Sequence, residues 1–224
     1  GKGNADRRWD VLPQQPSVGY DLAQNRLIVT AAALQPPIFN GQGTAAEKFG
    51  SYGALVGHEL TRAIDAKGSL VDAKGELRSW WTPADKTAWT QLGSRVAAQY
   101  NGYAFPGVKD AKVNGTLTQE ENLADLAGVE LAWAAYLSQE PQAKPADQQG
   151  FFRAWAALWP QQLSPNEAAA RVASDIRAPG KWRTNGPLAN LPAFGASFSC
   201  KPGQPMQRTD AEQIKVWRDR KSVV

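Results

Sequence analysis

The sequence predicts a mainly α-helical protein with one small β element near residues 25–40. Several stretches carry apolar residues at helical spacing, or open with a helix-capping residue followed by proline, and both signals are typical of helices. Only residues 27–30 form a short β-branched run that indicates a strand. Because no repeat or change of composition divides the chain, residues 1–224 are predicted to form a single domain.

The N-terminal part of the chain is expected to run from an extended segment through a strand into a helix. Residues 1–16 are polar and contain two prolines, so we expect an extended lead-in there. A turn at 21–26 precedes the strand at 27–30, and a pair of prolines then ends the regular structure. Residues 45–64 are predicted to form a helix because apolar residues recur at helical spacing near its end.

The central part of the chain is predicted to contain two longer helices. Residues 82–100 begin with a threonine N-cap followed by proline, which is a strong start signal. After a loop, residues 117–138 are predicted to form the second helix. Its start is indicated by Thr118 and Glu121, which have the spacing of a capping box.

The C-terminal third is predicted to combine loops with shorter helices. Residues 139–149 are polar and are interpreted as a connector. Residues 151–159 and 164–172 are predicted to be amphipathic helices. Further short helices are expected around 191–198 and 210–218.

Composition argues against several classes of function. The net charge is only +4 and the basic residues are scattered, so nucleic-acid binding is not expected. No apolar run approaches the roughly 18 residues of a membrane span, and no signal peptide is visible at Gly1. Cys200 is the only cysteine, which excludes an internal disulfide.

One short motif on the helix at 45–64 carries the chemical signal of the chain. In the zinc-peptidase pattern His-Glu-x-x-His, two histidines one turn apart hold Zn²⁺ and the glutamate acts as general base. His58 and Glu59 match this pattern, but Arg62 stands at the position of the second histidine. Arginine stays protonated and offers no lone pair to a metal. His58 is the only histidine, and a merely packed or surface histidine is its alternative interpretation.

Separate segments of the chain resemble, in order and spacing, the C-terminal catalytic lobe of the neprilysin and endothelin-converting-enzyme family of zinc metallopeptidases. The resemblance runs from about residue 20 to residue 217 and implies a thermolysin-like (gluzincin) catalytic lobe. The matching segments are residues 34–37, 57–61, 80–82, 113–115, 121–125, 151–152 with Trp159, 185–188, 198–200 with Met206, and 216–217.

The resemblance implies a role for residues on two helices. His58 matches the first zinc ligand, Glu59 the catalytic base and Glu121 the third protein ligand. Asp65 and Asp125 match carboxylates that orient the ligand histidines. Glu121 and Asp125 lie at i and i+4 and so share one helix face, for which a plain solvated face is the alternative interpretation.

The resemblance also implies residues that contact the substrate. Arg183 matches an arginine that binds the substrate backbone, and Tyr20 belongs to a segment with the same role. Asp175 matches the acidic residue just before an oxyanion-stabilising histidine, but this chain has Arg177 at the histidine position. Ordinary surface arginines are the alternative interpretation of Arg177 and Arg183.

Together these departures predict that zinc binding and catalysis have been lost, leaving Glu59, Asp125 and Arg183 as a vestigial catalytic set. We expect Arg62 to occupy the metal position and to pair with Glu121, with Glu59 as a further candidate partner. The expected function is that of a pseudopeptidase subunit that binds a peptide or protein partner and needs no cofactor. The alternative is an active zinc-dependent endopeptidase that cleaves small peptides, either with a rescued ligand set or because Arg62 and Arg177 are engineered changes.

The resemblance implies a larger N-terminal helical lobe, and we expect this chain, without that lobe, to be a fragment, a processed product or one subunit of a split protein. We therefore expect a partner, either that lobe or a related active peptidase chain, beside a peptide or protein ligand. A purely structural subunit without an open peptide groove is a third possibility. By the resemblance, a periplasmic or secreted location is expected.

Overall fold

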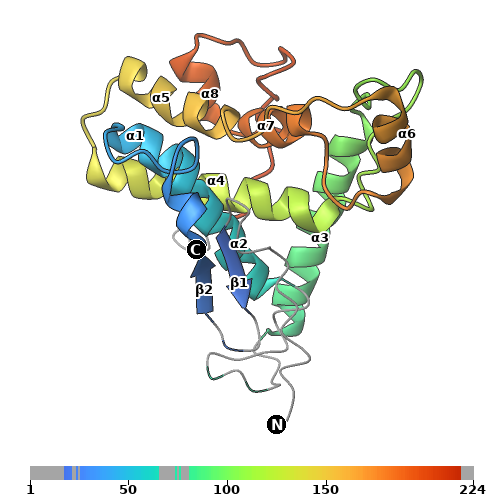
Figure 1. The fold of residues 1–224 in the computed structure, drawn as a ribbon, viewed down its shortest axis with the longest axis horizontal. Coiled ribbons are helices and arrows are strands. Elements are labelled where there is room, and N and C mark those ends of the chain that lie inside the picture. Colours follow the sequence, from blue (N-terminus) through green and yellow to red (C-terminus); the bar gives the residue numbers. More distant parts are fainter. Residues whose placement is uncertain are drawn as a thin grey trace.

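A computed structural model describes residues 18–21, 24, 26–65, 74, 76 and 81–217. The fold is mostly helical with one two-stranded sheet, as the sequence predicted (Figure 1). In Figure 1 the long helix α4 crosses the centre, with α5, α7 and α8 on one side and α2 with the sheet on the other. The elements are β1 Val18–Asp21, β2 Arg26–Val29, the 3-10 turn η1 Ala31–Leu34, α1 Ala45–Lys48, the π-helical turn η2 Phe49–Gly53, α2 Ala54–Ile64, α3 Pro83–Asn101, α4 Gln119–Gln139, α5 Pro145–Ala156, α6 Pro165–Ser174, α7 Gly180–Leu188 and α8 Pro192–Ser197.

The sheet is an antiparallel hairpin in which Val18 pairs with Val29 and Asp21 with Arg26. Strand β2 confirms the predicted strand to within one residue, and the predicted turn lies between the two strands. Strand β1 was not predicted, because a four-residue run containing Gly19 gives a weak strand signal. The predicted lead-in at 1–16 lies outside the described residues.

Close backbone contact between α2 and α4 positions the candidate site. A Cβ added to Gly57 would lie 2.8 Å from the Cα of Gly128, and one added to Gly128 would lie 2.4 Å from the backbone nitrogen of His58. Only glycine fits at both positions, so the two helices can cross with their backbones in contact. This crossing places the motif helix against the acidic first turns of α4.

The predicted helix at 45–64 is helical throughout but changes its geometry. It consists of α1, the π-helical η2 and α2 in succession. Gly50, in η2, packs directly on the backbone of Phe151, where an added Cβ would meet the carbonyl oxygen. The widened turn therefore lies where this segment makes its closest contact with α5.

Capping signals predicted some helix starts and failed at others. Thr82 forms the expected cap of α3, where Asp85 completes a capping box. The predicted capping box of Thr118 with Glu121 is wrong. The Thr118 hydroxyl instead donates to the carbonyl of Asn114 at 2.8 Å and accepts from the side-chain amide of Asn122 at 2.8 Å. Glu121 is therefore free to face α2.

Three predictions in the C-terminal third needed correction. The connector at 139–149 is shorter than predicted, because Pro145 opens α5 and Asp147 caps it. Helix α7 was not predicted, since it contains glycines and a proline that normally signal a loop. Residues 210–217 form turns and bends rather than the predicted helix. The predicted helix at 191–198 is confirmed as α8.

Helix α4 lies between two buried clusters that make up most of the core. One cluster joins Trp133 and Tyr136 to Phe151, Phe152 and Trp155 of α5. The other joins the first half of α4 to α3 and the C-terminal segment. Because the two clusters pack on successive halves of α4, contacts along its length fix its position.

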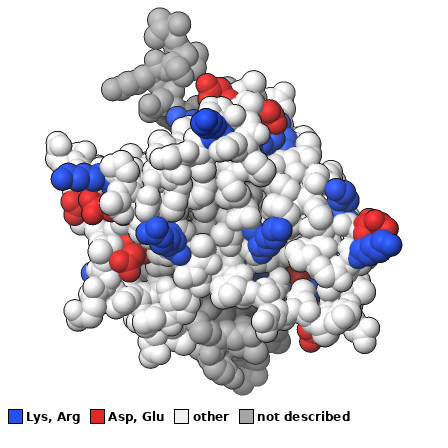
Figure 2. Space-filling view, turned by 90° about the horizontal axis from the view of Figure 1, so that it is seen from above, with Lys and Arg blue, Asp and Glu red and all other residues white. Residues whose placement is uncertain are grey.

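The face of the molecule drawn in Figure 2 carries no extended charged patch, because its Lys and Arg side chains lie apart and are mixed with Asp and Glu. Within the described part of the chain, no helix is long and apolar enough to cross a membrane.

Candidate functional site

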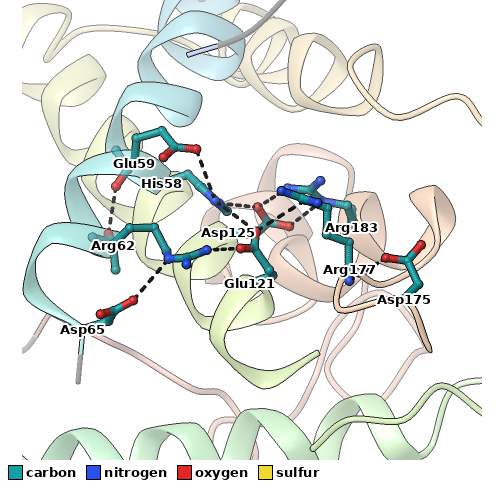
Figure 3. Close-up of polar contacts among 11 residues, drawn as sticks. His58, Glu59, Arg62, Asp65, Glu121, Asp125, Asp175, Arg177 and Arg183 are labelled. Carbon is teal, nitrogen blue, oxygen red and sulfur yellow. Dashed lines mark hydrogen bonds and ion pairs between the residues drawn. The ribbon is translucent and has the colours of Figure 1, made fainter. Parts of the chain in front are cut away.

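The crossing of α2 and α4 brings the predicted site residues together. Two residues one turn apart on α2, His58 and Arg62, face two residues one turn apart on α4, Glu121 and Asp125 (Figure 3). Each pair has the i, i+4 spacing that places two side chains on one helix face. The structure therefore brings these four residues, which the sequence analysis singled out, into one cluster.

His58 is buried and both of its ring nitrogens face carboxylates. Nδ1 lies 2.7 Å from Oδ1 of Asp125. Nε2 lies 3.3 Å from Oε2 of Glu121 and 3.6 Å from Oε1 of Glu59. Asp125 thus fixes the ring so that Nε2 points towards the other acids, which is the orienting role that the resemblance assigned to it.

Arg62 extends into the space between the helices and binds the acids there. Its guanidinium forms an ion pair and hydrogen bond with the Glu121 carboxylate, as predicted. Its Nε donates to Asp65 at 3.1 Å. The other expected partner, Glu59, lies near His58. Among the described residues, Glu59 forms no ion pair with Arg62. One arginine therefore links two acids on different elements.

Asp125 has no exposed surface and is bound from two sides. It accepts hydrogen bonds from Nε and an η-nitrogen of Arg183, each at 2.9 Å, in addition to its contact with His58. Burial alone would raise the pKa of Asp125, but the Arg183 guanidinium and His58 outweigh it and lower the pKa to about 2. Asp125 is therefore ionised at any physiological pH.

Arg183 comes from α7 and is held by an aromatic ring as well as by Asp125. Its guanidinium lies 3.7 Å from the centre of the Trp159 ring, within the range of a cation–π interaction. Sequence reasoning assigned Trp159 only to a family segment. The contact was missed because Trp159 lies beyond the end of α5 and Arg183 lies on α7, a helix that was not predicted.

Arg177 and Asp175 lie at the edge of the site, between α6 and α7. The Asp175 carboxylate accepts the backbone N–H of Arg177 at 2.9 Å and pairs with Arg171 at 3.6 Å. The Arg177 side chain is 51% exposed, and its Nε lies 3.8 Å from Oε2 of Glu121. Arg177 thus reaches the site but is not enclosed in it.

Glu59 lies on the exposed side of His58. Burial raises the pKa of the Glu59 carboxyl, while the nearby His58, Arg62 and Arg177 lower it by smaller amounts. Tyr20 lies in β1 opposite Leu27, and its side chain is outside the described residues. Its predicted contact with substrate therefore stays a prediction.

The residues that are present do not fit a zinc ion. A zinc peptidase site needs three protein ligands and an open position. Here His58 and Glu121 offer donor atoms, but the guanidinium of Arg62 already binds the Glu121 carboxylate where a third donor would be needed. In the described ranges, no group of three or more His, Cys, Asp or Glu side chains is arranged to hold a metal.

Comparison with known proteins gives a consistent family. Residues 19–214 match the model of peptidase family M13. Membrane metallo-endopeptidase-like 1 of Homo sapiens is 32% identical over 93% of this chain, and endothelin-converting enzyme 1 of Bos taurus is 31% identical over 94%. The chain spans 28% of the length of each of these curated relatives.

Solved structures agree with this result. PepO from Lactobacillus rhamnosis HN001 superimposes with a TM-score of 0.84 at 37% identity, over 94% of this chain and 32% of that one. The Mycobacterium tuberculosis zinc metalloprotease ZMP1 in complex with inhibitor gives a TM-score of 0.86 at 30% identity, over 97% of this chain and 35% of that one. The resemblance read from the sequence and the fold class are both confirmed.

Proposed function

The chain belongs to peptidase family M13, and from this premise we propose that it is a pseudopeptidase domain that has lost zinc binding and catalysis. In this role it serves as a subunit that binds a peptide or protein partner. The observation that supports the proposal is the ion pair between Arg62 and Glu121 at the position where this family pattern calls for a metal ligand.

The energetics of the site favour the arginine over a metal. For Zn²⁺ to bind His58 and Glu121, the guanidinium of Arg62 would have to leave both Glu121 and Asp65. A cation would then remain beside a dication, with one protein ligand too few. Changes that merely disturb the groups around zinc ligands already cost about 10- to 100-fold in affinity. Loss of a ligand is expected to cost more.

The decisive experiment measures zinc directly. The purified chain is incubated with equimolar Zn²⁺, desalted and analysed by inductively coupled plasma mass spectrometry, beside the Arg62→His variant. We expect no stoichiometric zinc in the unchanged chain and at least about tenfold more in the variant, because Arg62→His supplies the missing donor.

The matched control is Arg171→His, which adds a histidine on α6 outside the metal position. It should hold no more zinc than the unchanged chain. One zinc per unchanged chain, lost on His58→Ala, would overturn the proposal.

A second candidate function is an active zinc-dependent endopeptidase, and the geometry of His58 favours it. Asp125 still orients the ring, and Nε2 still faces Glu121 at 3.3 Å. In this alternative Arg62 swings away when zinc binds. Cleavage of a fluorogenic peptide by the unchanged chain, abolished by a chelator and by Glu59→Gln, would support the enzyme and exclude the pseudopeptidase.

The partner that we propose is the N-terminal lobe of the family or a related active peptidase chain, in the periplasm or outside the cell. Two exposed apolar side chains beside site residues support an interface here. Leu60, next to Glu59, is 45% exposed, and Ile176, next to Arg177, is 49% exposed. Light scattering on protein purified from its native source should give a mass above that of one chain. A mass of one chain would contradict the proposal.

A further inference from the structure

We propose that Arg177 binds a carboxylate of the peptide or protein partner, either an Asp or Glu side chain or a free C-terminus. This inference rests on the proposed function, because it names the chemical class of ligand that the degenerate site would recognise. The arginines of this site differ in their exposure and in the acids that they contact.

The nearest acid in sequence does not neutralise the Arg177 side chain. Asp175 uses its carboxylate to accept the backbone N–H of Arg177 and to pair with Arg171. Figure 3 shows Asp175 on the opposite side of Arg177 from Glu121. Asp175 therefore holds the backbone of Arg177 in place while its guanidinium extends the other way.

The acid that the guanidinium does approach is already engaged. Glu121 binds Arg62 through Oε1, and its Oε2 lies 3.3 Å from Nε2 of His58. The distance from Nε of Arg177 to that oxygen is 3.8 Å, which is too long for a hydrogen bond. Among the described residues, no hydrogen bond from the Arg177 guanidinium is found, so its N–H donors are available to a ligand.

Arg183 is the informative contrast within the same site. Two of its nitrogens donate to Asp125, its flat face lies on Trp159, and its side chain is only 12% exposed. A ligand would have to displace these contacts to use Arg183 fully. Arg177, at 51% exposure and without such contacts, can bind a ligand without breaking the site.

The chemistry of the guanidinium selects the ligand. A guanidinium is planar, permanently charged and presents parallel N–H donors that match a carboxylate in a bidentate pair. Glu59 lies near Arg177. Burial raises the pKa of the Glu59 carboxyl, and the positive charge of Arg177 lowers it by a smaller amount. A small free anion would therefore gain little here, whereas a peptide adds contacts of its own.

The test uses three fluorescent pools of random hexapeptides. One pool has an amidated C-terminus and one Glu, the second has no acidic residue but a free C-terminus, and the third has neither carboxylate. Binding is measured by fluorescence anisotropy with the unchanged chain, Arg177→Gln, Arg177→Lys and the control Arg153→Gln. Arg153 is an exposed arginine on α5, so its variant makes the same charge change elsewhere.

We expect at least one carboxylate pool to bind about 5- to 20-fold more tightly than the third pool. Arg177→Gln should abolish this difference, Arg177→Lys should restore only part of it, and Arg153→Gln should leave it unchanged. Which of the first two pools binds identifies the source of the carboxylate. Thermal unfolding of each variant confirms that the fold is retained.

Three results would overturn the inference. Equal binding of all three pools, or a preference that survives Arg177→Gln, would disprove carboxylate recognition by Arg177 while leaving peptide binding intact. Binding of no pool would exclude both the inference and a peptide-binding role, whereas stoichiometric zinc in the unchanged chain would contradict the pseudopeptidase proposal alone.

Discussion

Two carboxylates one turn apart on α4 have very different surroundings. Asp125 is fully buried, accepts hydrogen bonds from Arg183 and lies 2.7 Å from Nδ1 of His58. Glu121 is also buried, but the cations that face it, Arg62 and Arg177, are 27% and 51% exposed. The Asp125 side is held by contacts internal to the fold, whereas the Glu121 side is held by two partly exposed arginines.

The difference indicates which parts of a catalytic site can change without loss of the fold. Contacts around Asp125 join α2, α4 and α7, and so they stabilise the structure whether or not a metal is present. Around Glu121 the arginines Arg62 and Arg177 supply positive charge beside a buried acid. Under the proposed function, this charge keeps the acids together in place of a metal.

The largest effect is expected from Asp125→Asn. This change leaves the buried Arg183 guanidinium without its counter-charge, which typically costs about 3–5 kcal/mol of unfolding free energy. Urea denaturation measures the loss. Asp175→Asn is the matched control on an exposed pair, and it should cost about 1 kcal/mol or less. Equal losses in both variants would refute the contrast.

Arg62→Met should have the next largest effect. Met is apolar and of similar length, so the variant removes the charge that Glu121 and Asp65 share with little change in packing. We expect a loss of about 1–3 kcal/mol, since the buried Glu121 then loses its close ion pair and keeps only the longer approach of Arg177 and the contact with His58. The same measurement on Arg171→Met should show less than about 1 kcal/mol. A gain of stability in Arg62→Met would show that the ion pair is not needed to hold the helices.

A third acid of α4, Glu130, sharpens the comparison through pH. Burial raises the pKa of Glu130 to about 7, although its carboxylate accepts the backbone N–H of Val216 at 2.8 Å. Because the pKa in the folded state is above the usual 4.5, its contribution to stability is complete below pH 4.5 and is lost as pH rises through 7. Asp125, with its lowered pKa of about 2, contributes above its usual 3.8 and loses that stability as pH falls through 2.

The Glu130→Gln variant tests this difference. Between pH 4.5 and 8 the unchanged chain should lose about 3 kcal/mol that the variant retains, because glutamine does not ionise. Unfolding free energies measured across this range give the slope directly. If the two slopes are the same, Glu130 does not titrate in this range.

The smallest effect on stability is expected from Arg177→Gln. The Arg177 side chain is half exposed. Among the described residues, its only ion pair is the one with Glu121, at 3.8 Å. The unfolding free energy should change by about 0.5 kcal/mol or less, as for most surface substitutions. A loss above about 2 kcal/mol would mean that Arg177 holds the site together and would argue against a role in ligand binding.

Local sequence signals predicted those helices whose ends are stabilised by residues close by in the sequence. Thr82 and Asp85 cap α3 as predicted, because a capping box is complete within four residues of the chain. Thr118 has the same spacing to an acidic residue, but its hydroxyl donates to the carbonyl oxygen of Asn114 instead of capping the helix. Helix α7 escaped prediction because its glycines are required by tertiary contact. A Cβ on Gly186 would clash with the hydroxyl of Tyr100.

The sequence alone determined the family, the mainly helical fold and the presence of an arginine, Arg62, one helical turn after His58. Each of these follows from residue types at fixed spacing, and the i, i+4 geometry of a helix allows no other arrangement of His58 and Arg62. The tertiary structure alone decided which charges meet. The glycine contact of α2 with α4 places Arg62 on Glu121, and α7 lays Arg183 between Asp125 and Trp159 while leaving Arg177 exposed. The contacts of Arg62 with Glu121 and of Arg183 with Asp125 each join residues about 60 positions apart, and no local pattern specifies them.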